Sequence, residues 1–293
     1  MNNPKIRQVG IFTESEEITH WLECTLKLTT LSFDSVCILN KSSDIVKNSP
    51  SLIIVTERKF RALYNYLNKV NTLLPVLVVT RDFNGFSVPN ANHLTIDLLP
   101  LPAATIGLLE HSIKAVFQDF KLNQELTKLA HYDALTGAAN RLLFQDRCKQ
   151  ALKMAKRNKR AVSLLYFDLD DFKPINDTYG HDIGDELLKR FVKIVSSVSR
   201  ETDTLARLGG DEFALLLPDT PESELTQYCQ KLVQCLAQPQ QLNEQLIEIK
   251  CSIGAVSTSK EEHVTLIPQK LIKKADQAVY LAKEVEGTSF VIA

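Results

Sequence analysis

The sequence predicts two domains: an α/β domain with a doubly wound parallel sheet, then an α+β domain with a mostly antiparallel sheet flanked by helices. Three observations lead to this expectation. Short aliphatic runs alternate with helical patterns over roughly the first hundred residues. A long helical segment follows, and beyond it strands separated by helices include one Gly-Gly hairpin. A chain of 293 residues is long enough for two separate cores.

The first domain is expected over residues 1–105. Its strands are almost continuously apolar, which indicates a parallel sheet covered by helices on both faces. The expected strands are 6–12, 35–40, 51–56, 75–80 and 93–99, and the expected helices include 15–29 and 59–70.

A helical linker is expected over residues 106–131, within a helical pattern that runs from 103 to about 132. The segment has no Pro or Gly after Gly107, and its apolar spacing matches that of a coiled coil only in part. The recurring apolar residues are Ile113, Val116, Phe120, Leu126 and Leu129. We expect this helix to join the domains and to pair with its copy in a homodimer.

The second domain is expected over residues 132–293 and opens with the stretch DALTGAANR. Its expected helices are 142–158, 184–199, 221–237 and 268–284. Its expected strands are 161–167, 204–208, 213–217, 247–257 and 289–292.

Composition excludes several classes of protein. The net charge is −1 and both halves are nearly balanced, which argues against nucleic acid as a partner. No run of about 18 apolar residues occurs, so we expect no membrane association. The six cysteines form no Cys-x-x-Cys pair, which argues against a zinc or redox site. A reduced, cytoplasmic protein is expected.

Two acidic stretches carry the chemistry. Asp168 follows an apolar strand, and Asp211 follows the glycine pair of RLGGDEFALLL. If the hairpin lies beside the end of that strand, the two carboxylates converge. Oxygen donors without His or Cys suit Mg²⁺ or Mn²⁺, which recruits substrate phosphates. Asp170 and Asp171 are interpreted as helix N-cap residues.

Three motifs occur in order: DALTGAANR, FDLDDFKPINDTYGHDIGD and RLGGDEF. Together they resemble the GGDEF family, the diguanylate cyclases, over about residues 130–293. The resemblance implies a homodimer in which each subunit holds one GTP, and the two GTP are condensed to cyclic di-GMP with release of pyrophosphate. The alternative is a weak or inactive domain that binds GTP or cyclic di-GMP as a regulator.

The resemblance also implies residue roles. Asp168, Asp211 and the carbonyl of Leu169 would bind the metal. Asp211, Glu212 and Lys173 would be catalytic, with Asp211 as the candidate general base. The residues implied to bind substrate are Asn176 and Asp185, which would read guanine, together with Phe172 and Lys283. Arg200 and Asp203 match the family's inhibitory product site, although a helix end with a solvated charge pair is the plainer alternative.

The C-terminus departs from the family pattern. The family usually continues after the lysine with Gly-Arg-Asn, whereas this chain reads Glu284-Val285-Glu286-Gly287-Thr288, with no arginine. One phosphate contact is therefore expected to be missing. We expect activity with weakened triphosphate binding.

The first domain resembles the response-regulator receiver fold at the level of pattern only. Glu14 and Glu57 stand near the positions of the receiver's acidic residues, but the phosphorylatable Asp is replaced and Leu101-Pro102 stands where a Lys is required. Thr80 matches the hydroxyl of the fourth strand. A degenerate receiver is expected, used for dimerisation or for sensing a protein partner, with another α/β sensor domain as the alternative.

Overall fold

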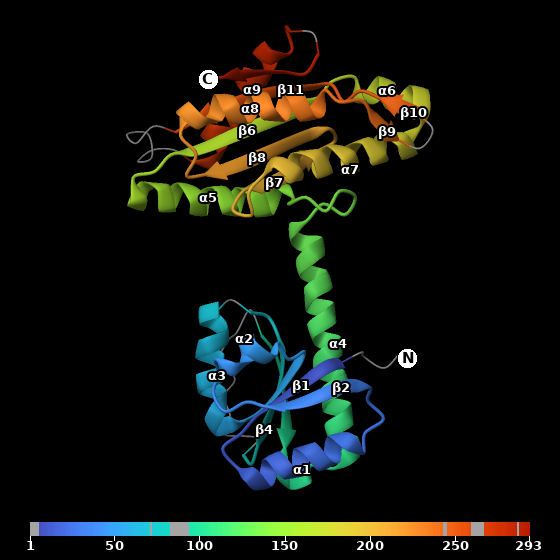
Figure 1. Cartoon of the computed structure of the whole chain (residues 1–293), viewed down its shortest axis with the longest axis vertical. Coiled ribbons are helices and arrows are strands. Elements are labelled where there is room, and N and C mark those ends of the chain that lie inside the picture. The colour runs from blue at the N-terminus through green and yellow to red at the C-terminus, as the bar shows by residue number, and fades with distance from the viewer. Residues whose placement is uncertain (1–5, 71, 83–93, 243–244, 259–266, 286) are drawn as a thin grey trace. The chain divides into compact units, whose positions relative to one another are not determined.

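The computed structural model describes residues 6–70, 72–82, 94–242, 245–258, 267–285 and 287–293. The chain divides into two units, Met1–Leu126 and Thr127–Ala293, and each is described by itself (Figure 1). Among the described residues, no helix is both long and apolar enough to cross a membrane.

The N-terminal unit contains a five-stranded, fully parallel sheet in the order β2-β1-β3-β4-β5. Its strands are β1 (Ile6–Phe12), β2 (Phe33–Ile38), β3 (Leu52–Thr56), β4 (Pro75–Thr80) and β5 (Thr95–Pro100). This strand order is one of the two common doubly wound arrangements. The predicted parallel sheet is therefore confirmed, with strand ends that differ from the expected ones by one or two residues.

Helices cover both faces of this sheet, as its apolar strands require (Figure 1). Helices α1 (Glu16–Lys27) and α4 (Ile106–His131) pack on one face, and α2 (Asp44–Asn48) and α3 (Glu57–Val70) on the other. The first turns of α4 bury Leu109, Ile113 and Val116 against the sheet. A 3-10 turn at Leu101–Ala103 precedes α4, so the helix begins at Ile106 and not at residue 103.

The C-terminal unit contains a second five-stranded sheet, in the order β12-β11-β6-β8-β7. Only the β11–β12 pair is parallel among the described strands of this sheet, which confirms the mostly antiparallel arrangement. The strands are β6 (Val162–Leu169), β7 (Thr204–Gly209), β8 (Glu212–Pro218), β11 (Cys251–Ser257) and β12 (Ser289–Ile292).

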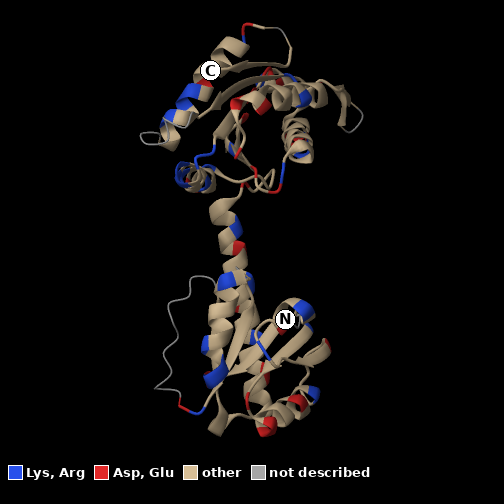
Figure 2. Ribbon diagram, turned by 60° about the vertical axis from the view of Figure 1, so that its left-hand side comes forward, with Lys and Arg blue, Asp and Glu red and all other residues tan. Residues whose placement is uncertain are grey.

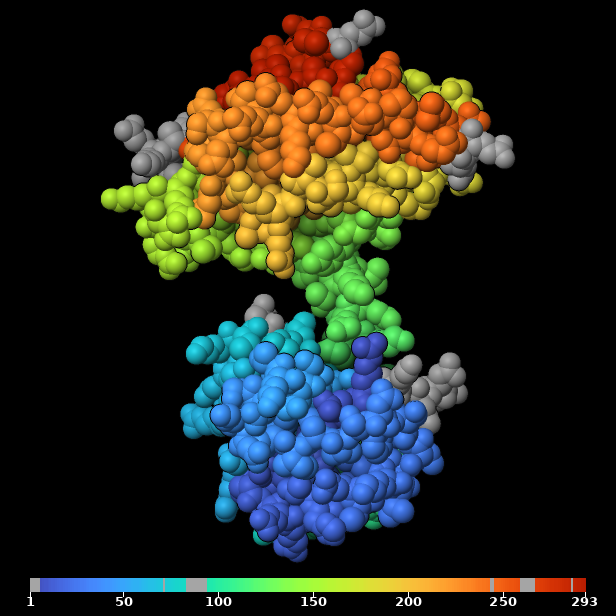
Figure 3. Space-filling view, in the orientation of Figure 1, coloured from blue at the N-terminus to red at the C-terminus, as the bar shows by residue number. Residues whose placement is uncertain are grey.

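Helices also cover both faces of this second sheet. Helices α5 (Arg141–Asn158) and α9 (Pro268–Ala282) pack on one face. Helices α7 (His181–Val198) and α8 (Glu222–Leu236) pack on the other and form much of the surface seen in Figure 3. Successive residues of a strand point to opposite faces, so Leu164 and Tyr166 of β6 face α5 and α9, whereas Leu165 and Phe167 face α7 and α8.

Several short elements differ from expectation. Helices α2 and α6 (Phe172–Tyr179) and the hairpin of β9 (Gln240–Leu242) and β10 (Gln245–Ile247) were not predicted. The strand expected over 247–257 begins at Cys251. Segments of three to eight residues are too short to show a hydrophobic period, which explains these differences.

Close packing of α9 on β11 depends on a glycine. A Cβ atom added to Gly254 would lie 1.9 Å from the carbonyl oxygen of Ala275 and 2.6 Å from the nitrogen of Val279. Helix α9 can therefore lie directly on the backbone of β11 only because this residue has no side chain. Ala275, Val279 and Lys283 are spaced four residues apart, so this contact also sets the position of Lys283 at the end of the helix.

Candidate active site

The glycine pair forms the predicted hairpin between β7 and β8. Gly210 has φ of +50°, a left-handed conformation that glycine adopts without strain. The strand that follows is held in the core, because Phe213 pairs with Phe167 of β6 and its ring lies 4.7 Å from the ring of Phe191 on α7. Buried aromatic packing thus fixes the hairpin that carries Asp211 and Glu212.

Strand register brings the acidic residues of the two motifs together. Asp168 lies directly opposite Glu212 in the β6–β8 pair, and the backbone nitrogen of Leu169 donates to the carbonyl oxygen of Asp211 at 3.3 Å. Tyr166, two residues before Asp168, is hydrogen-bonded to Glu212. Burial, followed by the nearby charge of Glu212, raises the pKa of the Tyr166 hydroxyl, which therefore stays protonated and can donate.

A lysine from the end of α9 completes this group. Lys283 Nζ lies 2.8 Å from Asp168 Oδ1. Desolvation opposes the charge on this lysine, but the hydrogen bond to Asp168 and the charges of Asp168, Asp170 and Asp211 raise its pKa. A cation therefore already sits among the carboxylates at this end of the sheet.

Asp170 does not act as the expected helix cap. Ser252 Oγ on β11 lies 3.0 Å and 3.1 Å from the two carboxylate oxygens of Asp170, and burial raises the pKa of Asp170. Asp171 does occupy the N-cap position of α6, but in the left-handed conformation and without a side-chain cap hydrogen bond. The cap interpretation is wrong for Asp170, and for Asp171 only the position is right.

The donor set fits a hard divalent cation. Asp168, Asp211 and the carbonyl of Leu169 offer oxygen only, and the ammonium of Lys283 shows that positive charge is stabilised there. Across the part of the chain that the structure describes, no three His, Cys, Asp or Glu side chains are grouped so that they could hold a metal ion. Since Mg²⁺ is commonly held by one or two carboxylates plus substrate phosphates, two protein carboxylates are sufficient.

The residues expected to bind nucleotide come from α6 and α7. A Cβ atom at Gly184 on α7 would lie 1.9 Å from Asn176 Oδ1, so Asn176 rests directly on the residue before Asp185. Asp185 and Lys173 are exposed and Phe172 is half-buried. The structure thus places Asn176 beside the Asp185 segment, and it shows no direct side-chain contact between Lys173 and the carboxylates.

Two arginines that the sequence argument left without a role hold the hairpin. Arg207 Nη1 lies 3.2 Å from Asp133 Oδ1 and Arg207 Nε donates to the carbonyl of Gly210 at 2.9 Å. Arg141 donates to the carbonyl of Leu208 from Nε at 3.0 Å and from Nη2 at 2.8 Å. Their positions in the motifs DALTGAANR and RLGGDEF were the available signal.

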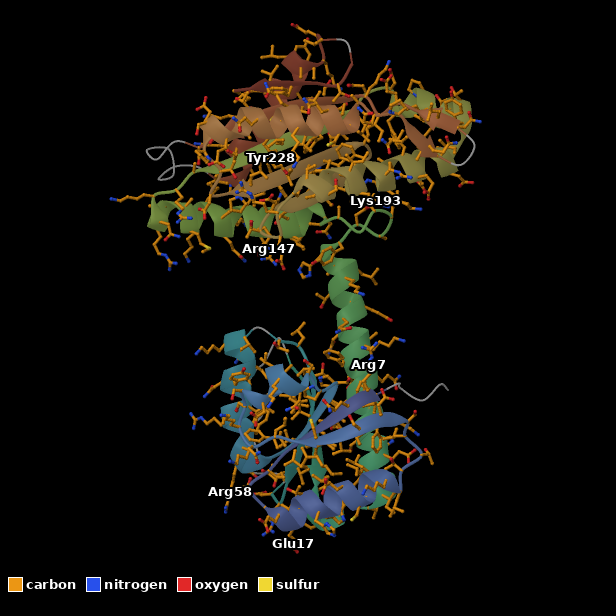
Figure 4. The ribbon with its side chains drawn as sticks, viewed as in Figure 1. Arg7, Glu17, Arg58, Arg147, Lys193 and Tyr228 are labelled. Atoms are coloured by element: carbon orange, nitrogen blue, oxygen red, sulfur yellow. The ribbon has the colours of Figure 1, made fainter. Side chains whose placement is uncertain are left out.

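The Arg200-x-x-Asp203 segment lies beside a hollow of about 690 Å³ whose lining includes Asp203 and Arg147. Arg147 lies on α5 (Figure 4). Asp203 Oδ2 accepts from the backbone nitrogen of Arg200 at 2.7 Å, while Oδ1 is buried without a hydrogen-bond partner in the described structure. The hydroxyl oxygen of Tyr228 on α8 lies 3.1 Å from Ser199 Oγ, next to this segment (Figure 4). A buried acceptor atom without a partner can accept a hydrogen bond from a ligand.

Charge of both signs surrounds these sites. Lys and Arg are interspersed with Asp and Glu along the ribbon of the C-terminal unit (Figure 2). This distribution agrees with the net charge of −1 for the whole chain.

Known proteins share this unit. A family model described as "Diguanylate cyclase, GGDEF domain" matches residues 130–288. The chain is 38% identical over 164 residues to the bifunctional diguanylate cyclase/cyclic di-GMP phosphodiesterase MucR of Pseudomonas aeruginosa, which covers 56% of this chain and 24% of MucR. It is 33% identical over 283 residues to the signaling protein YkoW of Bacillus subtilis, covering 92% of this chain and 35% of YkoW.

The fold is also similar to that of a solved structure. Diguanylate cyclase SiaD of Pseudomonas aeruginosa, in complex with its activator SiaC, matches with a TM-score of 0.53 and 26% identity, over 64% of this chain and 70% of that one. This chain spans only about a quarter to a third of the length of the two relatives named above.

The ion pair between Asp133 and Arg207 leads to a prediction about the stability of the fold. Burial opposes the charge on Asp133, but hydrogen bonds from Thr136 and Arg207 lower its pKa below the ordinary value. We expect Asp133→Asn to lower the free energy of unfolding by about 1–3 kcal/mol at pH 7. Because the pKa is lower in the folded state, this difference persists above about pH 4 and shrinks as the pH falls through the folded-state pKa.

Urea titrations at several pH values test this, with Asp219→Asn as the control. Asp219 Oδ2 lies 2.9 Å from Arg160 Nη1 in an exposed ion pair. Loss of this pair should lower the free energy of unfolding by less than about 0.5 kcal/mol. Equal effects of the two substitutions at pH 7 would contradict the account.

Proposed function

Since the chain belongs to the GGDEF family of diguanylate cyclases, we propose that it condenses two GTP molecules to cyclic di-GMP with release of pyrophosphate. One observation carries the proposal most directly. Strand register and helix packing bring Asp168, Asp211 and Lys283 to one end of the second sheet, as a metal- and phosphate-binding site requires. A bound Mg²⁺ or Mn²⁺ would neutralise phosphate oxygens and polarise the phosphorus centre.

The side chains of this chain would then have separate tasks. Asp168, the carbonyl of Leu169 and Asp211 hold the metal, with Glu212 as a supporting acid fixed by Tyr166. Asn176 and Asp185 read the guanine edge, because an amide and a carboxylate together match its carbonyl and N–H groups. Phe172 contributes a backbone contact from the start of α6.

The reaction needs two such sites facing each other. In each half-reaction a ribose hydroxyl of one GTP gives its proton to Asp211, and its oxygen forms a bond to the α-phosphorus of the other GTP. The bond between the α-phosphorus and the bridging oxygen breaks, and pyrophosphate leaves. Lys173 and Lys283 stabilise the charge on the phosphates. Two half-reactions close the ring and release two pyrophosphates.

A second candidate function is a regulator that binds GTP or cyclic di-GMP without turnover. The missing arginine after Lys283 favours it, since one phosphate contact is lost. Of the residues that replace the family pattern there, Glu284 and Val285 are exposed and Glu286 lies outside the described residues. The intact set of metal and guanine residues favours the enzyme with weakened triphosphate binding.

The enzyme and the regulator are distinguished by turnover. We expect the purified protein, incubated with GTP and Mg²⁺, to form cyclic di-GMP, and Asp211→Asn to lower the rate at least about 100-fold because the proton acceptor is lost. Chromatography of the nucleotides measures both. The control is Asp146→Asn, an exposed acid on α5. Nucleotide binding without product in the parent protein would support the regulator instead.

A homodimer through α4 is part of the proposal. The exposed part of this helix carries Leu122, Leu126 and Leu129, which are 53%, 54% and 70% exposed and are spaced four and three residues apart. Apolar residues at this spacing form one stripe that a second copy of the helix could cover. Pairing would bring two GTP sites together, as the reaction requires.

The N-terminal unit is proposed to regulate this dimer without aspartyl phosphorylation, as a degenerate receiver open to a protein partner. At the carboxyl ends of its strands Thr56 is hydrogen-bonded to Glu14, and Thr80 donates to Glu57 at 2.8 Å. Glu14 and Glu57, which stand near the positions where a receiver needs aspartate, are thus each hydrogen-bonded to a threonine. A protein partner is supported by the likeness to SiaD, whose structure contains an activator protein.

Sedimentation and turnover test the dimer together with its regulation. The double substitution Leu126→Glu and Leu129→Glu should give a monomer with at least about 10-fold lower turnover and unchanged GTP binding, because two charges replace the apolar stripe. Leu142→Glu, at a leucine 61% exposed on α5, is the control.

Beryllofluoride, which mimics an aspartyl phosphate, should change neither the sedimentation nor the turnover of the parent protein. A monomeric parent with full turnover would contradict the dimer, and activation by beryllofluoride would contradict the regulation.

Product inhibition is proposed at Arg200 and Asp203. The buried Oδ1 of Asp203 and the adjoining hollow support a ligand site, and Arg200 adds donors suited to guanine or phosphate. We expect Arg200→Ala to raise the inhibition constant of added cyclic di-GMP at least about 10-fold. Arg160→Ala, which removes an exposed arginine, is the control. Unchanged inhibition in the Arg200 variant would exclude this site.

A further inference from the structure

The ion pair between Lys283 and Asp168 occupies an atom that metal binding needs. Lys283 Nζ lies 2.8 Å from Asp168 Oδ1, and the two side chains are 44% and 23% exposed. The charges of Asp170 and Asp211 act on the same ammonium from further away and favour its charged form. In the described structure Lys283 therefore stands in for the cation that this end of the sheet stabilises.

The position of Lys283 follows from the packing of α9. The backbone of this helix lies against Gly254, which fixes Ala275 and Val279, and Lys283 follows one turn later. The helix ends at Ala282, so the Lys283 side chain is anchored through its backbone but is not itself enclosed. It can swing away from Asp168 without any movement of the helix.

We propose that Lys283 is a built-in counter-ion that keeps Asp168 occupied in the nucleotide-free protein and makes metal and triphosphate bind together. This rests on the proposed function, because it assigns a second role to a residue of the same site. Lys283 has to release Asp168 Oδ1 before a divalent cation can use that oxygen. A triphosphate offers the released ammonium new oxygen partners, whereas without nucleotide the ion pair is lost and nothing replaces it.

Removal of Lys283 should therefore affect the two ligands in opposite directions. In the nucleotide-free full-length protein, Lys283→Gln should tighten Mn²⁺ binding at least about threefold, since no ammonium then competes for Asp168 Oδ1. With Mn²⁺ present, the same variant should bind a non-hydrolysable GTP analogue at least about threefold more weakly, because a phosphate partner is lost. Electron paramagnetic resonance of free Mn²⁺ and calorimetry measure the two affinities.

Lys250→Gln is a matched control for net charge. Lys250 Nζ lies 3.9 Å from Asp171 Oδ2 at the same end of the sheet, and its side chain is 46% exposed, close to the value for Lys283. If local charge alone governed Mn²⁺ affinity, both variants would tighten it equally. The proposal predicts that only Lys283→Gln does so by threefold or more.

Three results would overturn the proposal: unchanged or weaker Mn²⁺ binding in Lys283→Gln, equal tightening in Lys250→Gln, or a parent protein that binds Mn²⁺ equally well with and without the nucleotide analogue. None of these measurements requires turnover. A protein that forms no cyclic di-GMP but shows the opposite shifts would contradict the proposed enzyme and would still support the counter-ion role of Lys283.

Discussion

The gathering of carboxylates and one lysine at the end of β6 is the constraint on which the rest of the C-terminal site depends. Asp168, Asp170 and Asp211 all act on the same lysine, so they lie within electrostatic range of one another. Burial, more than the neighbouring charges, raises the pKa of Asp170, while the hydrogen bond from Ser252 and the charge of Lys283 favour its ionised form. Lys283 also pairs with Asp168.

The surrounding scaffold positions these groups. Phe167, Phe191 and Phe213 pack as a buried aromatic group and fix β6 and β8 to α7. Arg207 and Arg141 donate hydrogen bonds to the backbone carbonyls of Gly210 and Leu208 at the hairpin. Apolar packing on one face and arginine hydrogen bonds at the hairpin thus keep the carboxylates in place, whereas the Lys283 side chain is 44% exposed.

The local sequence pattern was sufficient to predict much of the fold and of the candidate site. The apolar run before Asp168 predicted a strand end and the glycine pair before Asp211 predicted a hairpin, and the register of β6 and β8 meets the condition that the two lie side by side. Long-range contacts were not predictable in the same way. Asp133 meets Arg207 across 74 residues, and Ser252 meets Asp170 across 82, so neither pair leaves a local signal. The close approach of α9 to Gly254 was equally hidden, because a glycine in a strand has several explanations.

In the proposed enzyme, Asp168 and Asp211 form the metal site and Lys283 binds the phosphates once the nucleotide is present. A crystal structure with Mn²⁺ and a non-hydrolysable GTP analogue, with anomalous diffraction at the manganese edge, tests it most directly. We expect an anomalous peak bonded to Asp168 and Asp211, with Lys283 Nζ moved from Asp168 to a phosphate oxygen. A peak elsewhere, or Lys283 still paired with Asp168 beside bound nucleotide, would contradict it.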